Sequence, residues 1–563
     1  MYSPPDTAIL LVTTRSLTAR QERSIFAMAN KRRSFFLIPL LVLACALVGG
    51  LYGPSTQVAS AASGDDDISA SVKDFTRLYS TVEQNFADPV NADKAIYGGA
   101  IQGMLRTLDP HSNFFDPKAL AQMKEDQRGH YYGVGMRIEP KTNAAGVLQT
   151  IVVEPFVGSP AYKAGLRPND VIVNVNGKGT DGLTSTEVVD LLKGPRGTPV
   201  RVKVQRGEST DEITVDMIRD EINRSSVSAS FMLKNGIGYV RIDSTGFIET
   251  TGADFINALR KLDEPNLKGL VLDLRGNPGG LLTQAVDVAG HLLPKGSEVV
   301  SHHGRASAER SYKATEGNHG MNYPIVVLVN RNSASASEIV SGALQDHDRA
   351  WILGDNTFGK GLVQTVYPLQ ENTGLALTTA RYYTPSGRLI QRDYSSVSFF
   401  DYYYRNNTEA RNLSDVKMTD GGRTVYGGGG ISPDEKFEAP KPGPLETELY
   451  VKYEFQMYTK HFFSLHKEQL PAGWNFDAAQ MDAFKAWLHT EKFEYSDAAF
   501  TKEYEAIRHR MQGEIYKTAF NVDESTKYGL ETDPEVEAAE AAMPKAQALL
   551  LTASKKMAER AQK

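Results

Sequence analysis

The sequence predicts a multidomain α/β protein with an inserted β-rich domain and helical regions near both ends. The chain has 563 residues, too many for one hydrophobic core, so we expect roughly three to four domains of about 150 residues each. Residues 221–440 alternate apolar strands with helices, whereas residues 128–220 carry short β-rich runs. Residues 441–563 contain only four of the 48 glycines and are rich in Ala, Glu and Lys, which is typical of helices.

The composition excludes several classes of function. Hydrophobic residues make up 41% and charged residues 23% of the chain, as in globular proteins. The net charge of −6 argues against a nucleic-acid-binding protein, which should show a basic excess. The single cysteine, Cys45, excludes an intrachain disulfide and a cysteine zinc cluster. The eleven histidines show no metal-ligand spacing, so we expect no metal and no cofactor.

The N-terminal segment has the features of an export signal. The basic triplet 31–33 precedes an apolar run at 35–52, and small residues follow at 59–62. The segment is interpreted as a cleaved signal peptide or as an uncleaved membrane anchor; Cys45 also weakly resembles a lipoprotein site. Met28 would give a more compact start and is the preferred initiator. We therefore expect the mature protein in a bacterial cell envelope, in the periplasm or on the outer face of the cytoplasmic membrane.

Residues 1–67 thus comprise the targeting segment and a linker, and residues 68–127 form an N-terminal helical region. Apolar residues recur there at three- and four-residue steps. A second helical stretch spans 95–108 and ends at Asp109-Pro110. In the first helical stretch, the apolar residues that recur at these steps are Val72, Phe75, Leu78, Tyr79 and Val82.

Residues 128–220 form a β-rich domain with two short helices. Ser159 is placed as the N-cap of the first helix, with Pro160 at its first position and Gly165 just beyond its end. The second helix opens with a capping-box pattern at Thr184–Glu187. The expected strands are 132–138, 148–153, 171–175 and 200–204.

Residues 221–440 are expected to contain a parallel sheet. The runs 269–274 and 324–330 are almost wholly apolar, as in strands buried on both faces. Helices are expected directly after them, at 281–293 and 336–347. The later helical region, 441–563, is expected to end in a solvated tail after Pro544.

A glycine-rich segment at the start of the β-rich domain is a candidate peptide-binding site. Glycines beside a strand let backbone N–H groups converge on an anion such as a chain-terminal carboxylate, and an added peptide strand can pair with the sheet edge. The alternative is a small β domain in which the glycines only form a turn. The segment consists of Tyr132, Gly133, Val134, Gly135 and Met136.

The order of elements in this domain resembles a PDZ domain of the kind found in bacterial proteases. The resemblance implies a ligand that is a protein C-terminus with apolar end residues. From the position of the second helix, we expect this end to lie against Val188, Val189 and Leu192.

Two further segments place reactive side chains at turns. Ser335 lies in a Ser/Ala cluster where an apolar strand ends and a helix begins, a place that favours negative charge. Lys360 lies between two glycines, which leave room for it to fold inward. Taken alone, the serine cluster is more typical of a helix N-cap and the lysine of a surface turn. The segment 276–280, Gly-Asn-Pro-Gly-Gly, is either a plain strand-to-helix turn or a pair of N–H groups that face a substrate oxygen.

Taken together and in order, these motifs resemble the carboxyl-terminal processing proteases, also called tail-specific proteases. The resemblance spans roughly residues 70–440. Besides the segments above it includes Leu108–Ser112, Leu272–Arg275, Gln345-Asp346, Thr357–Gly361, Thr379–Gly387 and Gly430–Asp434.

The resemblance implies a Ser/Lys serine peptidase with a crotonase/ClpP-like core. By position, Ser335 matches the nucleophile, Lys360 the general base and Gln364 the residue that orients the lysine. It also implies an oxyanion hole of backbone N–H groups, drawn from Gly279, Gly280 and Ala336.

The sequence departs from the family pattern between Arg388 and Ile431. An insertion at 392–429 contains the aromatic run 399–404, which either packs on the core or contacts a substrate or second subunit. Asp346 is interpreted as a structural residue at a helix end rather than as a third member of the active site.

The leading hypothesis is an exported serine endopeptidase that recognises substrate C-termini through its PDZ domain. The alternatives are a non-catalytic peptide-binding scaffold of the envelope and an acyl-CoA enzyme on a crotonase-like core. The export signal and the PDZ segment argue against the acyl-CoA enzyme. The expected partners are proteins or peptides with apolar C-termini, with a homo-oligomer, an adaptor protein and N-terminal membrane association as open possibilities, and no nucleic acid.

Overall fold

The structure is a computed structural model that describes residues 65–143, 146–207, 209–404, 412–466, 469–471 and 473–561. The apolar run 35–52, together with Met28, Cys45 and most of the linker, lies outside the described residues. No helix in the described part of the chain combines the length and apolar character needed to cross a bilayer. The chain divides into two compact units, Met1–Ala92 and Asp93–Lys563.

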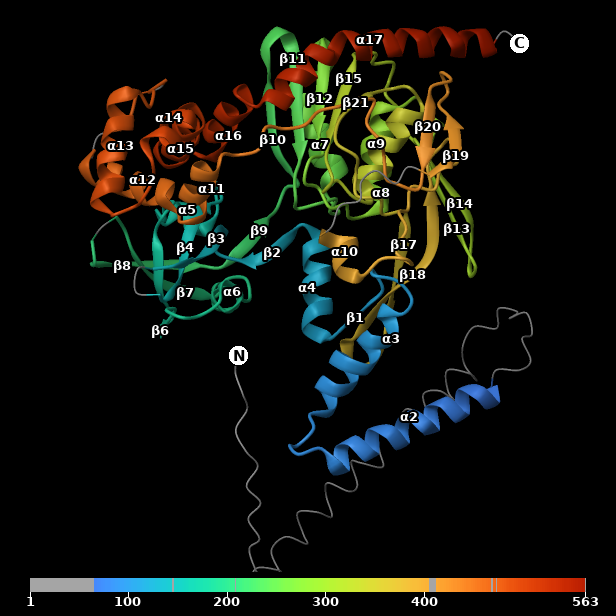
Figure 1. Cartoon of the computed structure of the whole chain (residues 1–563), viewed down its shortest axis with the longest axis horizontal. Coiled ribbons are helices and arrows are strands. Elements are labelled where there is room, and N and C mark those ends of the chain that lie inside the picture. The colour runs from blue at the N-terminus through green and yellow to red at the C-terminus, as the bar shows by residue number, and fades with distance from the viewer. Residues whose placement is uncertain are drawn as a thin grey trace, which may run out of the picture. The chain divides into compact units, whose positions relative to one another are not determined.

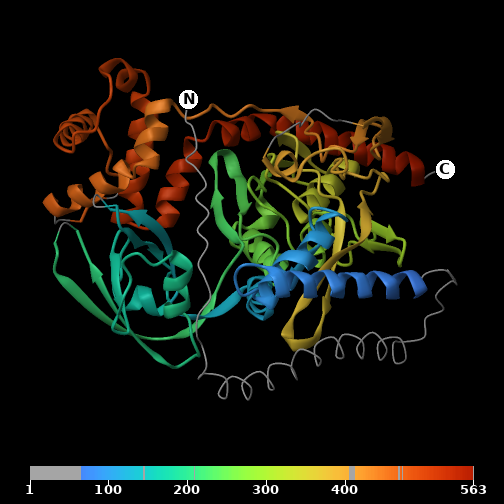
Figure 2. The same cartoon turned by 60° about the horizontal axis from the view of Figure 1, so that its bottom comes forward.

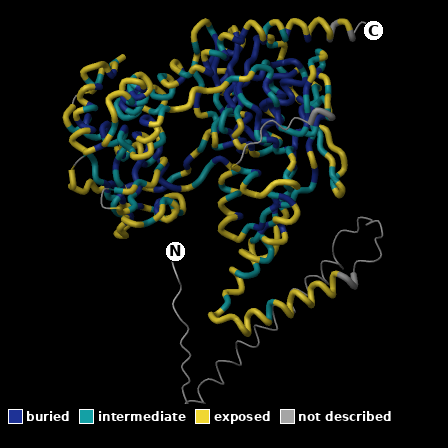
Figure 3. The backbone as a smooth tube through the Cα atoms, viewed as in Figure 1, coloured by how far each residue is buried: buried dark blue, intermediate teal, exposed yellow. Residues whose placement is uncertain are grey.

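In the first unit, the predicted helical periodicity is confirmed. Helix α2 (Asp65–Asn85) is amphipathic, and its described residues are exposed or half-buried (Figure 3). The apolar side chains that remain exposed on it include Ile68, Val72, Phe75, Leu78 and Val82.

The second unit starts with a helical segment and a tight turn. The predicted helix at 95–108 is present as a π-helix (Lys94–Ile101) continued by α3 (Gln102–Arg106). The carboxylate of Asp109 accepts hydrogen bonds from the backbone of His111 and Ser112, which closes the turn after it. Strand β1 (Asn113–Phe115) and helix α4 (Pro117–Arg128) follow.

The β-rich domain has a sheet in the order β3-β4-β5-β7-β8, with β6 on β5. The predicted caps are confirmed: Ser159 Oγ accepts from the backbone of Tyr162, and Thr184 and Glu187 form a capping box. The elements are β3 (Met136–Thr142), β4 (Leu148–Pro155), α5 (Pro160–Lys163), β5 (Val171–Val175), β6 (Lys178–Gly179), α6 (Ser185–Leu192), β7 (Pro199–Gln205) and β8 (Glu212–Ile218).

The strand expected at 132–138 is instead split in two. Strand β2 (His130–Gly133) pairs with β9 (Asp220–Asn223), and only β3 joins the main sheet. The break lies at Gly135, whose φ is 78° and whose Cβ, if present, would lie 2.4 Å from Ser159 Cβ. Only glycine fits this turn.

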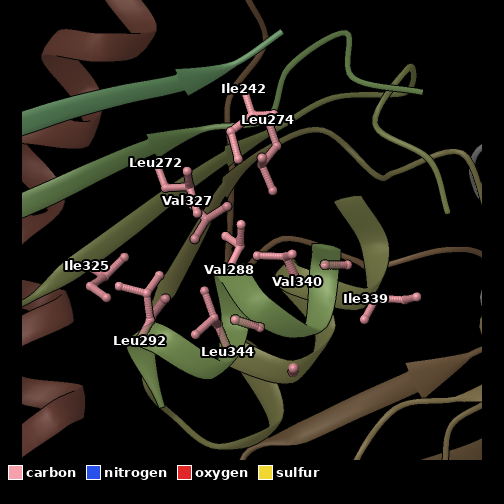
Figure 4. Close-up of a cluster of buried hydrophobic side chains, with 14 of the residues drawn as sticks. Ile242, Leu272, Leu274, Val288, Leu292, Ile325, Val327, Ile339, Val340 and Leu344 are labelled. Carbon is pink, nitrogen blue, oxygen red and sulfur yellow. The ribbon is translucent and has the colours of Figure 1, made fainter. Parts of the chain in front are cut away.

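The α/β core is a sheet in the order β10-β11-β12-β15-β16-β21, parallel from β11 to β21. The predicted apolar strands and the helices after them are confirmed, and their side chains form the main buried cluster (Figure 4). The strands are β10 (Val227–Met232), β11 (Ile237–Ile242), β12 (Gly269–Asp273), β15 (Ile325–Val329), β16 (Trp351–Gly354) and β21 (Glu435–Lys436). The helices of this cluster are α7 (Thr251–Lys261), α8 (Leu282–Leu292) and α9 (Ala336–Asp346).

The other face of the sheet is covered by the C-terminal helix α17 (Pro534–Ala561) (Figure 1). The expectation of a solvated tail after Pro544 is wrong. The helix continues through this proline, and Ala546, Leu550 and Ala553 beyond it are buried. Burial of the apolar side chains of α17 against the sheet contributes more free energy than is lost with the one backbone hydrogen bond that a proline removes.

A second sheet carries the segment after Lys360. It has the order β1-β18-β13-β14, with β17 (Leu362–Pro368) paired to β18 (Gly374–Tyr383). The insertion supplies helix α10 (Phe399–Tyr404) and a hairpin of β19 (Asn412–Met418) and β20 (Thr424–Gly427). The hairpin of β13 (Glu298–Gly304) and β14 (Ser307–Lys313) completes this sheet.

The rest of the C-terminal region is helical, as predicted, with an aromatic-rich core of its own. These helices lie beside the β-rich domain in both views (Figures 1 and 2), and Tyr453 OH donates to the carbonyl of Pro140 at 3.2 Å. They are α11 (Pro444–Val451), α12 (Glu454–Leu465), α13 (Ala478–Thr490), α14 (Asp497–Lys502), α15 (Tyr504–Ala519) and α16 (Val522–Glu531).

Candidate active site

Ser335 occupies the sharp turn between β15 and α9. Its φ of 53° and ψ of −110° are unusual for a residue with a side chain. Such strain is maintained only where the surroundings enforce it, and it is typical of functional turns. Ser335 is half-buried, whereas Ala334 and Ala336 on either side are buried. Within the run Ala334-Ser335-Ala336, the serine is therefore the accessible residue.

The other two serines of the cluster have structural roles. Ser333 is fully buried, and its Oγ donates to the carbonyl of Leu274 at 2.8 Å. Ser337 is also fully buried, and its Oγ lies 2.8 Å from Oδ1 of Asn277. Both hydroxyls fasten the serine turn to the glycine-rich turn after β12.

The glycine-rich turn lies directly against Ser335. A Cβ on Gly279 would lie 2.6 Å from Ser335 Cβ and 2.9 Å from the backbone nitrogen of Ala336. The N–H of Gly279 is already donated to Asn277 Oδ1 at 2.9 Å. Of the predicted oxyanion donors, this leaves the N–H groups of Gly280 and Ala336 for a substrate oxygen.

Lys360 lies in the turn that precedes β17. It is half-buried, and burial lowers the pKa of its amine, while the charges of Glu338 and Asp109 partly oppose that shift. A lowered pKa is what a lysine needs to act as a base near neutral pH.

Two buried side chains tie the backbones of Ser335 and Lys360 together. Glu338 Oε2 accepts from the backbone nitrogens of Ser335 at 2.7 Å and Lys360 at 2.9 Å. The hydroxyl of Tyr382 is shared between the carbonyl oxygens of the same two residues. The fold thus brings together two residues that are far apart in the sequence.

Each carboxylate oxygen of Glu338 accepts two hydrogen bonds. Its Oε1 accepts from Thr357 Oγ1 at 2.5 Å and from the nitrogen of Gly359 at 2.7 Å. Burial raises the pKa of Glu338, and its four hydrogen-bond donors oppose that shift. Because all four contacts are donors to oxygen, the geometry is that of a carboxylate acceptor.

Gln364 lies on β17, but its amide donates to Thr378 Oγ1 at 3.2 Å. A continuous strand through both residues would place the side chains of Lys360 and Gln364 on one face. Lys360 instead precedes the strand, and the pairing with β18 shifts register between Val363 and Gln364. The role of Gln364 therefore stays a prediction.

The predicted peptide-binding residues fall into two groups. A cleft of about 1510 Å³ opens beside the edge strand β3, with the β-rich domain, the core and the C-terminal helices as its walls. Val188 does not line the cleft and is fully buried in the core of the β-rich domain, to which Val134, Met136 and Leu192 also belong. Tyr132 and Gly133 lie on β2. The predicted residues that line the cleft are Val134, Gly135, Met136, Val189 and Leu192.

Asp346 lies away from the two reactive side chains, in a buried ion pair with Arg388. Its second oxygen accepts from the nitrogen of Ser386 at 3.0 Å. These contacts favour the structural interpretation of Asp346. Among the described residues, no group of three or more His, Cys, Asp or Glu side chains is arranged to hold a metal ion.

Sequence reasoning missed three residues that organise the site: Asn277, Glu338 and Tyr382. A signal existed for Glu338, because Ser335 and Glu338 have the Ser-x-x-Glu spacing of a capping box. Asn277 and Tyr382 act across long separations in the chain, and their contacts have no local signature.

The chain is similar to a known peptidase family and to carboxy-terminal processing proteases. The family model described as "Peptidase family S41" matches residues 236–395, and the model "PDZ domain" matches residues 151–206. The carboxy-terminal-processing protease of Bartonella bacilliformis is 42% identical over 304 residues, which are 53% of this chain and 68% of that protein. Carboxy-terminal processing protease CtpA of Bacillus subtilis is 32% identical over 369 residues, 65% of this chain and 76% of that protein. A solved photosystem II D1 C-terminal processing protease is 32% identical, with 66% of this chain and 89% of that chain covered at a TM-score of 0.32.

Proposed function

The chain belongs to Peptidase family S41 with the carboxy-terminal processing proteases, and from this premise we propose that it hydrolyses peptide bonds with Ser335 as nucleophile and Lys360 as general base. It is a serine-type peptidase with a PDZ domain. The observation that carries the proposed dyad is the shared anchoring of both residues by Glu338 and Tyr382. The half-buried, pKa-lowered amine of Lys360 supports it.

The proposed reaction begins with a neutral Lys360. An unperturbed lysine has a pKa near 10.4, and burial, which disfavours the charged amine, lowers the pKa of Lys360. The amine takes the proton of Ser335 Oγ, and the oxygen attacks the scissile carbonyl. The ammonium then protonates the leaving amine, and water hydrolyses the acyl-enzyme.

Backbone N–H groups of Gly280 and Ala336 are proposed to stabilise the oxyanion. Ala336 opens α9, whose N-terminus favours negative charge nearby. Gln364 is proposed to orient the lysine with a neutral amide, because a carboxylate at this position would raise the pKa of Lys360 and impair the base. A core of the crotonase/ClpP type is proposed on the same grounds, a parallel sheet whose glycine-rich turn faces the nucleophile.

The substrates are proposed to be exported proteins that are recognised by their C-termini. The PDZ domain is a peptide-binding module, and the apolar residues of its cleft suit an apolar terminal side chain. The basic and apolar N-terminal sequence supports export to the cell envelope.

The test is cleavage of casein and of a tailed peptide by the wild type, Ser335→Ala and Lys360→Ala. Both variants should lose activity by at least about 1000-fold, because each removes a partner of the dyad. Lys261→Ala, at the exposed end of α7, is the matched lysine control and should behave as the wild type. Equal cleavage by all four proteins would overturn the proposed dyad, whereas absence of cleavage by the wild type would favour a peptide-binding scaffold.

A further inference from the structure

We propose that helix α10 of the insertion completes the pocket of the general base, with Tyr402 and Tyr403 as positioning residues that lock His111 and the lysine turn together and exclude water from Lys360. This inference rests on the proposed role of Lys360. It assigns a role to the insertion, a segment in which the sequence departs from the family pattern.

Helix α10 divides its aromatic side chains between the interior and the surface. Tyr402 is 3% exposed, whereas Phe399, Phe400 and Tyr404 are 56%, 60% and 72% exposed. Of the two alternatives for the aromatic run, packing on the core therefore holds for Tyr402. In Figure 1 the helix lies near the start of β17, directly after the lysine turn.

A directed chain of hydrogen bonds connects α10 to that turn. The N–H of Gly361, next to Lys360, donates to Gln391 Oε1 at 2.8 Å. This contact fixes the orientation of the amide, and Gln391 Nε2 lies 3.2 Å from the Tyr402 hydroxyl oxygen. An amide N–H only donates, so the oxygen of Tyr402 accepts here and its own proton points elsewhere.

The chain continues through His111. The Tyr402 hydroxyl lies 3.0 Å from His111 Nε2, and the Tyr403 hydroxyl lies 3.2 Å from Nδ1 and 3.0 Å from the carbonyl of Pro110. Because a carbonyl only accepts, Tyr403 donates to Pro110 and accepts from Nδ1–H. The network thus assigns a neutral His111 with its proton on Nδ1, which accepts from Tyr402 at Nε2.

Aromatic rings pack around this chain of hydrogen bonds. The ring of Tyr402 meets Phe358 edge-on at 5.5 Å, and the guanidinium of Arg392 lies 3.8 Å from the centre of the Phe358 ring and 4.3 Å from that of Tyr402. The backbone N–H of Arg392 also donates to the carbonyl of Gly359 at 3.0 Å. The turn that carries Lys360 is therefore held by α10 and by Gln391 and Arg392, which precede α10 in the sequence.

The electrostatics of the pocket agree with this arrangement. Burial lowers the pKa of His111 to about 3, so His111 brings no positive charge beside the lysine at neutral pH. The ionisable groups around Lys360 come from every element packed there: Glu338 from α9, Asp109 and His111 from the turn before β1, Tyr382 from β18, Arg392 from the insertion, and Tyr402 and Tyr403 from α10.

Tyr402→Phe tests the inference, with Tyr404→Phe as its matched control. Tyr402→Phe keeps the ring but breaks the chain at both Gln391 and His111, which admits water and favours the ammonium form of Lys360. The low-pH limb of kcat/KM should move up by about one pH unit, and kcat at pH 7 should fall about tenfold with KM unchanged. Tyr404→Phe removes a hydroxyl from the same helix at an exposed position and should match the wild type.

Tyr403→Phe provides a second break in the chain should Tyr402→Phe not fold, and it should move the same limb in the same direction. A folded Tyr402→Phe or Tyr403→Phe with the pH profile and kcat of the wild type would overturn the inference. Lys360→Ala separates the two proposals. An inactive Lys360→Ala beside unaltered tyrosine variants refutes only the role of α10, whereas an active Lys360→Ala refutes the dyad itself.

Discussion

Ser335 and Lys360 come from different elements, yet both donate their backbone N–H to one oxygen of Glu338. A buried carboxylate is costly unless every acceptor site is used. Glu338 meets this condition with four donors, two on each oxygen. Its role is therefore to fix the distance between the two turns rather than to exchange protons with the substrate.

Glu338→Gln should loosen the link between the serine turn and the lysine turn. The amide has one acceptor oxygen, so its NH₂ group must face either the N–H groups of Ser335 and Lys360 or the Thr357 hydroxyl and the N–H of Gly359, and at least one backbone donor loses its partner. Each unsatisfied buried donor costs about 1–3 kcal/mol, so we expect a clear fall in the free energy of unfolding and a loss of kcat/KM of about 100-fold. Urea denaturation and peptide hydrolysis measure both quantities.

Glu187→Gln is the matched control, because Glu187 is also a capping-box glutamate, on the exposed α6. It should keep the kcat/KM of the wild type. Unchanged hydrolysis by Glu338→Gln would show that the shared carboxylate does not matter for catalysis.

At the scale of elements, two strand-to-helix turns meet face to face. The turn after β12 and the turn after β15 lie on neighbouring parallel strands, so both are at the same edge of the sheet. Gly279 permits the contact, because its φ of 97° and the absence of a side chain leave space for Ser335. The topology thus places the proposed oxyanion donors beside the proposed nucleophile.

Gly279→Ala should abolish activity by pushing Ser335 away from the turn. Gly296→Ala is the control for backbone strain alone, because Gly296 has a similar φ of 87° and nothing within 4 Å of an added Cβ. Both variants should lose about 1 kcal/mol of stability or more from the strained φ. Only Gly279→Ala should lose kcat; retained kcat would contradict the close contact with Ser335.

The sequence predicted the elements well where the signal was local. Apolar runs predicted β12 and β15, and caps at Ser159 and Thr184 predicted α5 and α6. The prediction failed where a tertiary contact determines the local structure. The expected strand is split at Gly135 because of the close approach of Ser159. Helix α17 continues through Pro544 because the sheet packs against it.

The same distinction holds for the candidate site. The positions of Ser335, Lys360 and the glycine-rich turn followed from motifs. The long-range contacts of Glu338 with the lysine turn, of Tyr382 with both turns and of Tyr402 with His111 did not. Hydrogen bonds between distant segments leave no periodic pattern in a sequence.

At the scale of the whole molecule, the C-terminal helix is joined to the catalytic core. Arg275, directly before the glycine-rich turn, pairs with Asp273 and also with Asp533 and Glu535 at the start of α17. Burial acts to raise the pKa of Asp273, but Arg275 outweighs it and holds that pKa below its usual range. The C-terminal region therefore supports the turn that lies against Ser335.

The cleft beside β3 gives a prediction about substrate recognition. Val189→Asp should raise KM for peptides with apolar C-termini by about tenfold, because it places a charge where an apolar side chain should bind. The kcat should change little. Ile218→Asp is the control, since Ile218 is exposed on β8 and does not line the cleft. Equal KM values for the two variants would contradict recognition through this cleft.

The most direct test of the Ser335–Lys360 dyad is the rate at which a fluorophosphonate labels Ser335, followed by intact-protein mass spectrometry across pH. Because the folded pKa of Lys360 is lowered, the rate should rise with pH through one ionisation below 10.5. Lys360→Met, which keeps a buried chain without an amine, should label at least about 100-fold more slowly and without that ionisation. Labelling of Lys360→Met at the wild-type rate, or a wild-type limb near 10.5, would contradict a neutral lysine as the base.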